Sequence, residues 1–318
     1  DVDFGKITLF VGNYDFWMES SELAAKLKSS ANQKKEEQIK ELQDFIARFS
    51  ANASKSKQAT SRKKQLDKIT LDDIKPSTRK YPFIQFTPER ELGNDLLRVE
   101  DVSKTIEGVK ILDNITFTLR PGDKTVLISR NELATTTLMQ IISGEMKPDT
   151  GTVTWGQTVK KTYLPRDINS EFTDSDLTVI DWLRQYAPKG EDDNTFLRGF
   201  LGKMLFSGED VMRQVSVMSG GEKVRSMLSK MMLSKANVLL MDDPTNHLDL
   251  ESITALNNSL IDFKGSIVFT SHDHEFIQTI ADHIIEVTNK GLVERFDTKY
   301  DDFLEHEVVQ KQVHDLYD

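Results

Sequence analysis

The segment from Met218 to Asp249 constrains the fold more than any other part of the chain. It begins with MSGGE at 218–222 and, after a helix-forming stretch, reaches a run of apolar or small residues that ends in Asp242 and Asp243. Such a run is typical of a buried parallel strand, and open α/β sheets bind ligands at the carboxyl ends of these strands. Glycines at a helix N-terminus favour anion binding through backbone N–H groups. The segment therefore predicts an α/β fold with an anion site at one sheet edge.

The motifs in this segment resemble those of ATP-binding cassettes. MSGGE followed by an apolar strand and DDPTNHLD resembles the signature motif, the Walker B strand and the D-loop. SGGE and DPTNHLD together resemble the ABC-F family, the tandem-cassette proteins of translation, and the similarity spans essentially the whole chain. After the apolar strand Ile267–Thr270, His272 stands at the switch-histidine position. Alone, His272 could equally be a surface histidine, but four elements in family order and spacing favour the cassette.

The resemblance implies a fold and a set of residue roles. The fold is an α/β ATP-binding cassette, with a mixed sheet of the P-loop NTPase type and a helical subdomain at about 176–235, preceded by an α-helical hairpin linker. Such cassettes pair head to tail, so each nucleotide lies between one cassette's Walker motifs and the other's signature motif. ATP and Mg²⁺ are the implied cofactors. The implied roles are catalysis by Asp243 and His272; nucleotide binding by Ser129, Asn131, Ala134, Thr135, Thr136, Thr137 and Asp242; Mg²⁺ binding by Thr136 and Asp242; signature contacts in trans by Ser219, Gly220, Gly221 and Glu222; and a D-loop contact by Asp249.

An internal repeat indicates the domain organisation. Four residues recur at a constant offset of 286 positions, namely Gly5, Phe10, Tyr14 and Asp15 at Gly291, Phe296, Tyr300 and Asp301. The second copy closes a cassette, so we expect the first copy to close an earlier one. The expected organisation is the end of a first cassette at 1–17, an interdomain linker at 18–90, a second cassette at 91–305 and a C-terminal helix at 306–318. The chain is thus expected to be the carboxyl-terminal part of a tandem protein.

The linker is predicted to be a basic helical hairpin. Residues 16–49 lack Pro and Gly and carry an apolar seam, which predicts a helix of roughly 45–50 Å. A small, polar, basic stretch follows, and an apolar pattern resumes up to Pro76. Residues 26–80 hold 15 Lys or Arg against 7 Asp or Glu, although the whole chain has a formal net charge of −10. A solvated helix face would also explain this charge, but a projecting basic tip favours contact with a polyanion. The residues expected to bind RNA are Lys55, Lys57, Arg62, Lys63 and Lys64.

A short extended segment is expected between the hairpin and the cassette. Tyr81–Thr87 alternates apolar and polar residues and is flanked by proline, which predicts a linker lying along the next domain. In the family that the chain resembles, the interdomain hairpin reaches the peptidyl-transferase region of the ribosome and the P-site tRNA. The expected partners are therefore the first cassette of the same polypeptide and the ribosome, with its rRNA and P-site tRNA.

The Walker A loop departs strongly from its pattern. GxxxxGK[ST] loops hold phosphates with backbone N–H groups and a lysine. This chain has SRNELATT at 129–136, in which Ser129 and Ala134 replace the glycines and Thr135 replaces the lysine. Only Thr136 fits the pattern, and Glu132 adds a negative charge beside the expected polyphosphate site. Losing one charge-assisted contact costs roughly 1.5–3 kcal/mol.

Three further positions depart from the family pattern. Pro165 stands where the Q-loop glutamine is expected, and Ile106 where an adenine-stacking aromatic is expected. Asp243 replaces a glutamate base, which withdraws the carboxylate by roughly 1.5 Å and can cost about 100-fold in rate. We therefore expect a degenerate nucleotide site in this cassette. The intact signature motif is expected to complete the nucleotide site of the first cassette, with Asp249 bridging the two cassettes.

Three functional classes remain open at this stage. A translation factor is favoured by the basic hairpin, the repeat and the ABC-F-type motifs, and 45–52 and 61–68 resemble the YbiT-type subgroup. The alternatives are the ATPase subunit of a membrane transporter and a DNA-associated cassette protein. No apolar run reaches the roughly 20 residues of a membrane span, so no membrane partner is expected. The absence of cysteine excludes disulfides and fits a cytoplasmic location. The tandem protein is expected to hydrolyse ATP to ADP and phosphate, and this half alone to be weak or inactive.

Overall fold

The computed structural model describes residues 79–173 and 176–317 and, nearer the start, residues 2, 3, 6, 7, 26, 30, 32–44, 64 and 66. Contacts divide the chain into two compact units, Asp1–Lys80 and Tyr81–Asp318. In the first unit, β1 (Val2–Asp3) pairs antiparallel with β2 (Lys6–Ile7). Residues 32–44 are helical, which confirms the expected helix over this part of the first arm.

The expected basic tip of the hairpin falls almost entirely outside the described residues. Lys55, Lys57, Arg62 and Lys63 lie outside them, whereas Lys64 is helical and exposed. The hairpin and its role in RNA binding therefore stay predictions.

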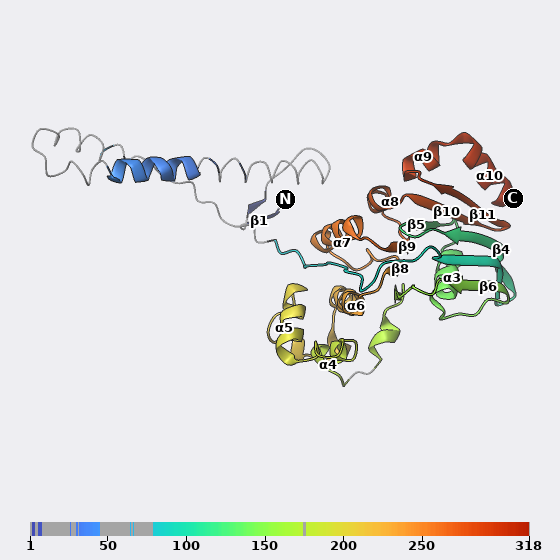
Figure 1. The fold of residues 1–318 in the computed structure, drawn as a ribbon, viewed down its shortest axis with the longest axis horizontal. Helices are drawn as coiled ribbons and strands as arrows, with labels where there is room; N and C mark the ends of the chain where they lie inside the picture. The colour runs from blue at the N-terminus through green and yellow to red at the C-terminus, as the bar shows by residue number, and fades with distance from the viewer. Residues whose placement is uncertain are drawn as a thin grey trace, which may run out of the picture. The chain divides into compact units, whose positions relative to one another are not determined.

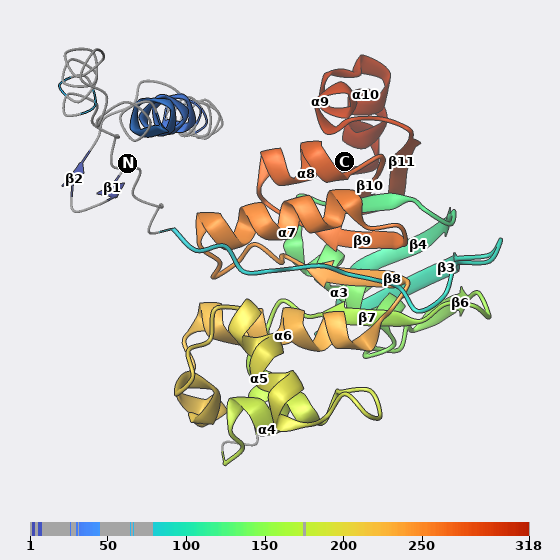
Figure 2. The same cartoon turned by 60° about the vertical axis from the view of Figure 1, so that its left-hand side comes forward.

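The second unit is built on a six-stranded sheet (Figures 1 and 2). The strand order is β11-β10-β5-β9-β8-β7, and every neighbouring pair is parallel except β10 with β11. Every residue of β8, β9 and β10 is buried, which explains the apolar runs in β8 and β9. The strand bounds are Lys124–Ile128 (β5), Lys161–Leu164 (β7), Val238–Asp242 (β8), Ser266–Thr270 (β9), His283–Thr288 (β10) and Gly291–Phe296 (β11).

A separate antiparallel sheet covers one face of the six-stranded sheet. It has the order β4-β3-β6, formed by Leu97–Ile106 (β3), Val109–Leu119 (β4) and Thr150–Trp155 (β6). Its apolar side chains and those of α3 (Glu132–Ser143) share one core cluster with Val238, Leu240 and Val268 of the six-stranded sheet. The sequence predicted one mixed sheet for the cassette, and it did not predict this separate antiparallel sheet.

Helices cover the opposite face and form a subdomain at one end. Leu239, Met241 and Ile267 alternate with the residues above and join a second core cluster with α6 (Gly220–Ser234), α7 (Leu250–Asp262) and α8 (His274–Ile280). The helical subdomain adds α4 (Val179–Arg184), α5 (Asn194–Lys203) and 3-10 turns at Asn169–Phe172, Asp210–Met212 and Val215–Val217 (Figure 2). Its aromatic residues Trp182 and Phe206 are buried in this second core cluster.

The segment that enters the second unit is extended and packs along the cassette. Pro82, Ile84 and Phe86 are buried, and the residues between them are exposed. The Phe83 N–H donates to the Lys203 carbonyl at 2.8 Å, so the segment is fixed to the end of α5. This alternation confirms that the stretch lies along the domain that follows it.

Two helices end the described chain. α10 (Glu307–Tyr317) packs against β10 and β11, and α9 (Tyr300–Glu305) packs against α8 and α10. Phe303, Val309 and Val313 of these two helices are buried. The C-terminal helix expected at 306–318 corresponds to α10. The packing brings the end of α10 beside the loop that follows β5, where Tyr317 meets Arg130.

Candidate nucleotide site

Parallel strand order brings the predicted site segments to one edge of the sheet. β5, β9 and β8 are neighbours, so the loops after Ile128, Thr270 and Asp242 leave the sheet side by side. These loops carry SRNELATT, the switch-type His272, and the acidic pair Asp242–Asp243. The fold therefore places the Walker A-like, Walker B-like and switch segments at the carboxyl edge of the sheet. Open α/β sheets bind their ligands at this edge.

A phosphate-binding loop needs backbone N–H groups that are free to donate to the phosphate. In the Walker A-like loop of this chain, several of these N–H groups already donate to oxygens at the start of α3. Asn131 caps α3: its Oδ1 accepts the Leu133 N–H at 3.1 Å, and its carbonyl accepts the Ala134 N–H at 2.9 Å. The Asn131 N–H itself donates to Ser129 Oγ at 3.1 Å. Three N–H groups of the loop are thus bonded to oxygens of the loop itself.

The end of α10 closes this loop from a second side. The Arg130 N–H donates to the Tyr317 hydroxyl at 2.8 Å, and that hydroxyl donates to the Val287 carbonyl at 3.0 Å. The Arg130 guanidinium lies over the Tyr317 ring, 4.2 Å from its centroid. Burial raises the pKa of the Tyr317 hydroxyl, although hydrogen bonds from Ser129 and the Arg130 backbone oppose that rise.

Glu132 lies between a guanidinium and an imidazole side chain. Its Oε2 is 2.7 Å from Arg166 Nη2, and its Oε1 is 3.3 Å from His272 Nε2. Arg166 follows β7 and His272 follows β9, so the carboxylate links two loops of the same edge. The sequence indicated that Glu132 would bring negative charge to this site, and the structure adds the two partners.

The residues of α3 that were expected to bind nucleotide differ in burial. The Thr135 hydroxyl donates to the Glu132 carbonyl at 3.0 Å, and its side chain lies where the pattern has a lysine. Ala134, Thr135 and Thr137 are all buried, with Thr137 fully so. Thr136 is half-buried and interacts with Asp242. Of the α3 residues expected to bind nucleotide, Thr136 alone is not buried.

Asp242 and Thr136 form an oxygen donor set that fits Mg²⁺. Thr270 Oγ1 donates to Asp242 Oδ1 at 2.6 Å, while the buried Oδ2 has no partner of good hydrogen-bond geometry. Burial raises the pKa of Asp242, and the Thr270 and Thr136 hydroxyls oppose the rise. Mg²⁺ prefers hard oxygen ligands, retains several waters, and takes substrate phosphates as further ligands. Thr136 and Asp242 would hold such an ion and supply charge for polyphosphate binding.

The two residues expected to be catalytic lie on the same edge. Asp243 has φ of +54°, a left-handed conformation that Asp tolerates better than most residues. Its N–H donates to Thr270 Oγ1 at 2.8 Å, so the strand-end threonine fixes both acidic residues. His272 is 62% exposed and contacts Glu132.

The signature segment is exposed and capped at the N-terminus of α6. The Ser219 N–H donates to Glu222 Oε2 at 2.8 Å, and the Glu222 N–H donates to Ser219 Oγ at 3.4 Å, which forms a capping box. Burial acts to raise the pKa of Glu222, but the bonds from Ser219 and the Arg213 guanidinium outweigh it and lower that pKa. Ser219 and Gly220 are exposed, so this helix end is open to a ligand or partner.

The D-loop packs directly beneath the signature glycines. A Cβ at Gly220 would lie 3.1 Å from His247 Cγ, and one at Gly221 would lie 3.0 Å from the His247 carbonyl. Asp249 caps α7, because its Oδ1 accepts the Ser252 N–H at 2.8 Å, and it remains exposed. The predicted signature and D-loop residues therefore form one continuous exposed surface.

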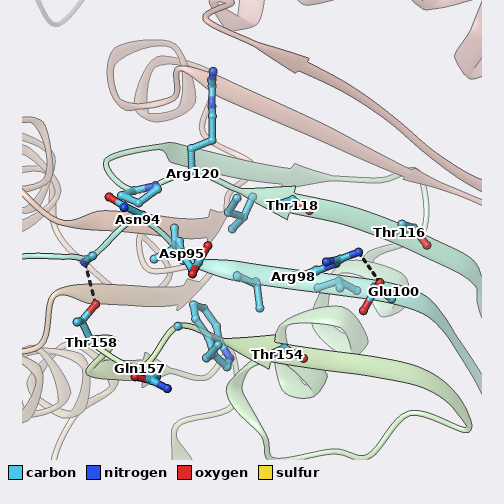
Figure 3. A pocket seen from close by; sticks show the side chains of 18 residues that line it. Asn94, Asp95, Arg98, Glu100, Thr116, Thr118, Arg120, Thr154, Gln157 and Thr158 are labelled. Carbon is cyan, nitrogen blue, oxygen red and sulfur yellow. Dashed lines mark hydrogen bonds and ion pairs between the residues drawn. The ribbon is translucent and has the colours of Figure 1, made fainter.

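A cavity of about 860 Å³ lies elsewhere, on the antiparallel sheet (Figure 3). Arg98, Glu100, Thr116 and Thr154 point into it from β3, β4 and β6, and Arg98 pairs with Glu100 at 2.8 Å. None of the site residues predicted from the sequence lines this cavity. It is therefore separate from the nucleotide site.

Two of the site's contacts were missed by sequence reasoning. Arg166 directly follows Pro165, the position that departs from the Q-loop pattern, so its neighbourhood gave a signal. Tyr317 gave none, because it is 188 residues from Ser129. Ile106 ends β3 and packs against the core cluster of the antiparallel sheet.

Comparison with solved structures identifies the fold. An ATP-binding cassette, MJ0796, in a dimeric post-hydrolysis state with ADP and Pi, aligns with 64% of this chain and 100% of its own at a TM-score of 0.54 and 17% identity. An ATP-binding subunit of an ABC transporter aligns with 69% of this chain and 96% of its own at a TM-score of 0.55 and 20% identity. At these identities the likeness establishes the fold, and the fold is that of an ATP-binding cassette.

Family models agree with the fold. Two models, both described as ABC transporter, match residues 1–86 and 112–246. The chain is therefore an ATP-binding cassette protein, a class that binds ATP with Mg²⁺. Within the described residues, no helix has the length and apolar character needed to cross a membrane.

Three named relatives are more similar to this chain in sequence than the solved structures are. The Bacillus subtilis protein YkpA, an uncharacterized ABC transporter ATP-binding protein, is 64% identical over all of this chain and 58% of its own length. The probable ATP-binding protein YbiT of Escherichia coli O157:H7 is 40% identical over 96% of this chain and 57% of its own. The Arabidopsis thaliana ABC transporter F family member 5 is 29% identical over 96% of this chain and 44% of its own. The chain thus spans little more than half the length of its nearer relatives.

Proposed function

We propose that this chain is the carboxyl-terminal part of a cytoplasmic ABC-F tandem ATPase of the YbiT-type subgroup, which acts on the ribosome as a translation factor. The repeat at an offset of 286 residues supports an earlier cassette in the same polypeptide. The share of YkpA and YbiT that the chain covers supports it too. The name of the Arabidopsis relative and the SGGE and DPTNHLD motifs support the ABC-F assignment.

In this proposal the cassette donates its signature motif to the nucleotide of the first cassette. The observation that carries it is a contrast between two helix N-termini of one domain. At α6, Ser219 and Gly220 are exposed, and the capping box bonds Ser219 to Glu222 without using the N–H groups of Gly220 and Gly221. At α3 the N–H groups are bonded to oxygens of this same chain. The open helix end can bind a phosphate, because N–H groups and the helix dipole favour an anion there.

In this arrangement the signature segment would contact the nucleotide, and the D-loop would contact the first cassette. Ser219 Oγ and the N–H groups of Gly220 and Gly221 would bind the γ-phosphate of the ATP held by the first cassette. Asp249 would bridge the two cassettes, since it lies exposed at the end of the D-loop on the same surface. ATP-driven closure would then reposition the interdomain hairpin, whose basic residues Lys55, Lys57, Arg62, Lys63 and Lys64 would contact rRNA and the P-site tRNA.

The test is Ser219→Arg in the tandem protein. Arginine removes the hydroxyl and fills the phosphate position, so ribosome-stimulated ATP turnover should fall at least about 100-fold, as for loss of a preorganised phosphate contact. The matched control is Ser170→Arg, an exposed serine of the same helical subdomain, which should leave turnover unchanged. Wild-type turnover in the Ser219→Arg protein would exclude signature donation.

A further inference from the structure

Of the five residues from Arg130 to Ala134, all but Glu132 donate their backbone N–H to a partner within the chain. A polyphosphate binds a loop of this kind chiefly through its backbone N–H groups. The partners of these N–H groups are Tyr317 Oη for Arg130, Ser129 Oγ for Asn131, Asn131 Oδ1 for Leu133 and the Asn131 carbonyl for Ala134. A nucleotide would therefore have to displace existing bonds to enter.

The Glu132 carboxylate already occupies an anion position. It lies 2.7 Å from the Arg166 guanidinium and 3.3 Å from the His272 imidazole, which come from two different loops. A guanidinium and a neighbouring imidazole suit a phosphate oxygen as well as a carboxylate oxygen. An entering terminal phosphate would compete with Glu132 for these groups and would be repelled by its charge.

Tyr317 is held in place from several sides. Its hydroxyl accepts from Arg130 and donates to the Val287 carbonyl, and its own carbonyl accepts the Asn289 amide at 3.0 Å. Val309 and Val313, on the same helix, are buried against the sheet. The hydroxyl is therefore positioned by a packed helix, and displacing it means moving the end of α10.

We propose that Glu132 and Tyr317 are internal ligands of this cassette's own nucleotide site. The carboxylate stands in for a terminal phosphate between Arg166 and His272, and the hydroxyl takes an N–H group that a phosphate would use. Together they determine that the site excludes MgATP. This inference deepens the proposed function and rests on it for its biological meaning, because it explains why the cassette contributes its signature motif alone.

Exclusion by internal ligands differs from simple loss of the Walker A lysine. If the missing lysine were the whole cause, Thr135→Lys would restore MgATP binding without further change. If Glu132 and Tyr317 fill the site, Thr135→Lys leaves it filled. Binding then returns when the same chain also carries Glu132→Gln and Tyr317→Phe, which remove the charge and the hydroxyl and keep the side-chain sizes.

Calorimetric titration of this chain with MgATP up to about 1 mM, a range that detects weak sites, separates these cases. The wild type and Thr135→Lys should show no saturable binding. The triple variant should bind with a dissociation constant at least about tenfold below the upper limit of this range, the effect of regaining one or two phosphate contacts. The matched control joins Thr135→Lys to Glu275→Gln and Tyr300→Phe, an exposed acid and a tyrosine of neighbouring helices, and should bind as Thr135→Lys does.

Two results would overturn the proposal: Thr135→Lys alone binding as tightly as the triple variant, or a folded triple variant that still fails to bind. Hydrogen exchange at the Arg130 amide gives a second readout that needs no nucleotide. Tyr317→Phe should raise that exchange rate, and an unchanged rate would contradict the role given to the hydroxyl. The Ser219→Arg experiment reports on the other helix end in the tandem protein, so either idea can fail while the other stands.

Discussion

Gly220 of the signature motif and His247 of the D-loop are in close packing contact. A Cβ at Gly220 would lie 3.1 Å from His247 Cγ and 3.2 Å from its Cβ. His247 has φ of +65°, a left-handed conformation that is costly for a residue with a side chain. The backbone of His247 therefore has little freedom to move away, and the glycine is required by packing as well as by any ligand.

Gly220→Ala should consequently destabilise the cassette and disturb the D-loop. The methyl group must push His247 by a few tenths of an ångström, and we expect a loss of about 1 kcal/mol, within the range of small overpacking effects. Thermal or urea unfolding of the chain measures it. The matched control is Gly199→Ala in α5, where a Cβ meets nothing within 4 Å. It should stabilise by roughly 0.5–1 kcal/mol, because glycine is unfavourable inside a helix. Equal effects at the two positions would contradict the packing argument.

Asp249 has two separable roles, and two substitutions distinguish them. Its Oδ1 caps α7 through the Ser252 N–H at 2.8 Å. Asp249→Ala should lower the free energy of unfolding by about 1 kcal/mol, the usual effect of losing a cap, whereas Asp249→Asn should keep the cap and the stability. If Asp249 also bridges the cassettes by its charge, both variants should reduce ATP turnover of the tandem protein. Full turnover in Asp249→Asn would limit the residue to capping.

Much of the sheet could be predicted from the sequence, because buried parallel strands have continuous apolar runs. Val238–Asp242 and Ser266–Thr270 are buried throughout. The sequence predicted a buried strand that ends in the acidic pair Asp242–Asp243 and an apolar strand at Ile267–Thr270. The antiparallel sheet was harder, since the short strand Thr150–Trp155 is mostly exposed or half-buried and carries little apolar signal. Its pairing with Leu97–Ile106 depends on tertiary packing.

The sequence could predict only those parts of the site that lie within short local motifs. SGGE, the acidic pair at the end of β8 and the altered loop at 129–136 predicted which edge of the sheet carries the site. The closure of the loop by Tyr317 could not be predicted, because nothing near Tyr317 in the sequence indicates a partner 187 residues away. Likewise the ion pair of Glu132 with Arg166 depends on how β7 and α3 meet at the sheet edge, which no local pattern encodes.

Asp242 is expected to lower the stability of the fold as pH rises. Burial raises its pKa in the folded protein above the ordinary value near 3.8. The folded state then binds more protons than the unfolded state between the two pKa values, so the free energy of unfolding falls as pH rises through this window. Asp242→Asn removes the titrating group while its amide oxygen can still accept from Thr270. It should therefore be more stable than the wild type at neutral pH, by on the order of 1 kcal/mol, and the gain should vanish below the unfolded pKa.

Urea unfolding of both proteins from pH 3 to pH 7 checks this difference, with Asp297→Asn as control. Asp297 is 85% exposed, so its substitution should have little effect at any pH. A pH-independent difference between Asp242→Asn and the wild type would show that the carboxyl does not titrate differently in the folded state.

The choice between ribosome and DNA is the last prediction, and it concerns the basic residues of the linker. Replacing Lys55, Lys57, Arg62, Lys63 and Lys64 with glutamine removes five positive charges from one short segment. Binding to a polyanion depends on released counterions, so the variant should bind ribosomes more weakly and with a shallower salt dependence. Cosedimentation with ribosomes across a salt series, with duplex DNA as competitor, measures both quantities.

The control replaces Lys26, Lys28, Lys34, Lys35 and Lys40 of the first arm, which removes the same charge elsewhere. If the tip is the contact, the tip variant loses more affinity than the arm variant, and DNA competes poorly. Equal losses would indicate a general charge effect, and strong competition by DNA would favour a DNA-associated cassette protein over a translation factor.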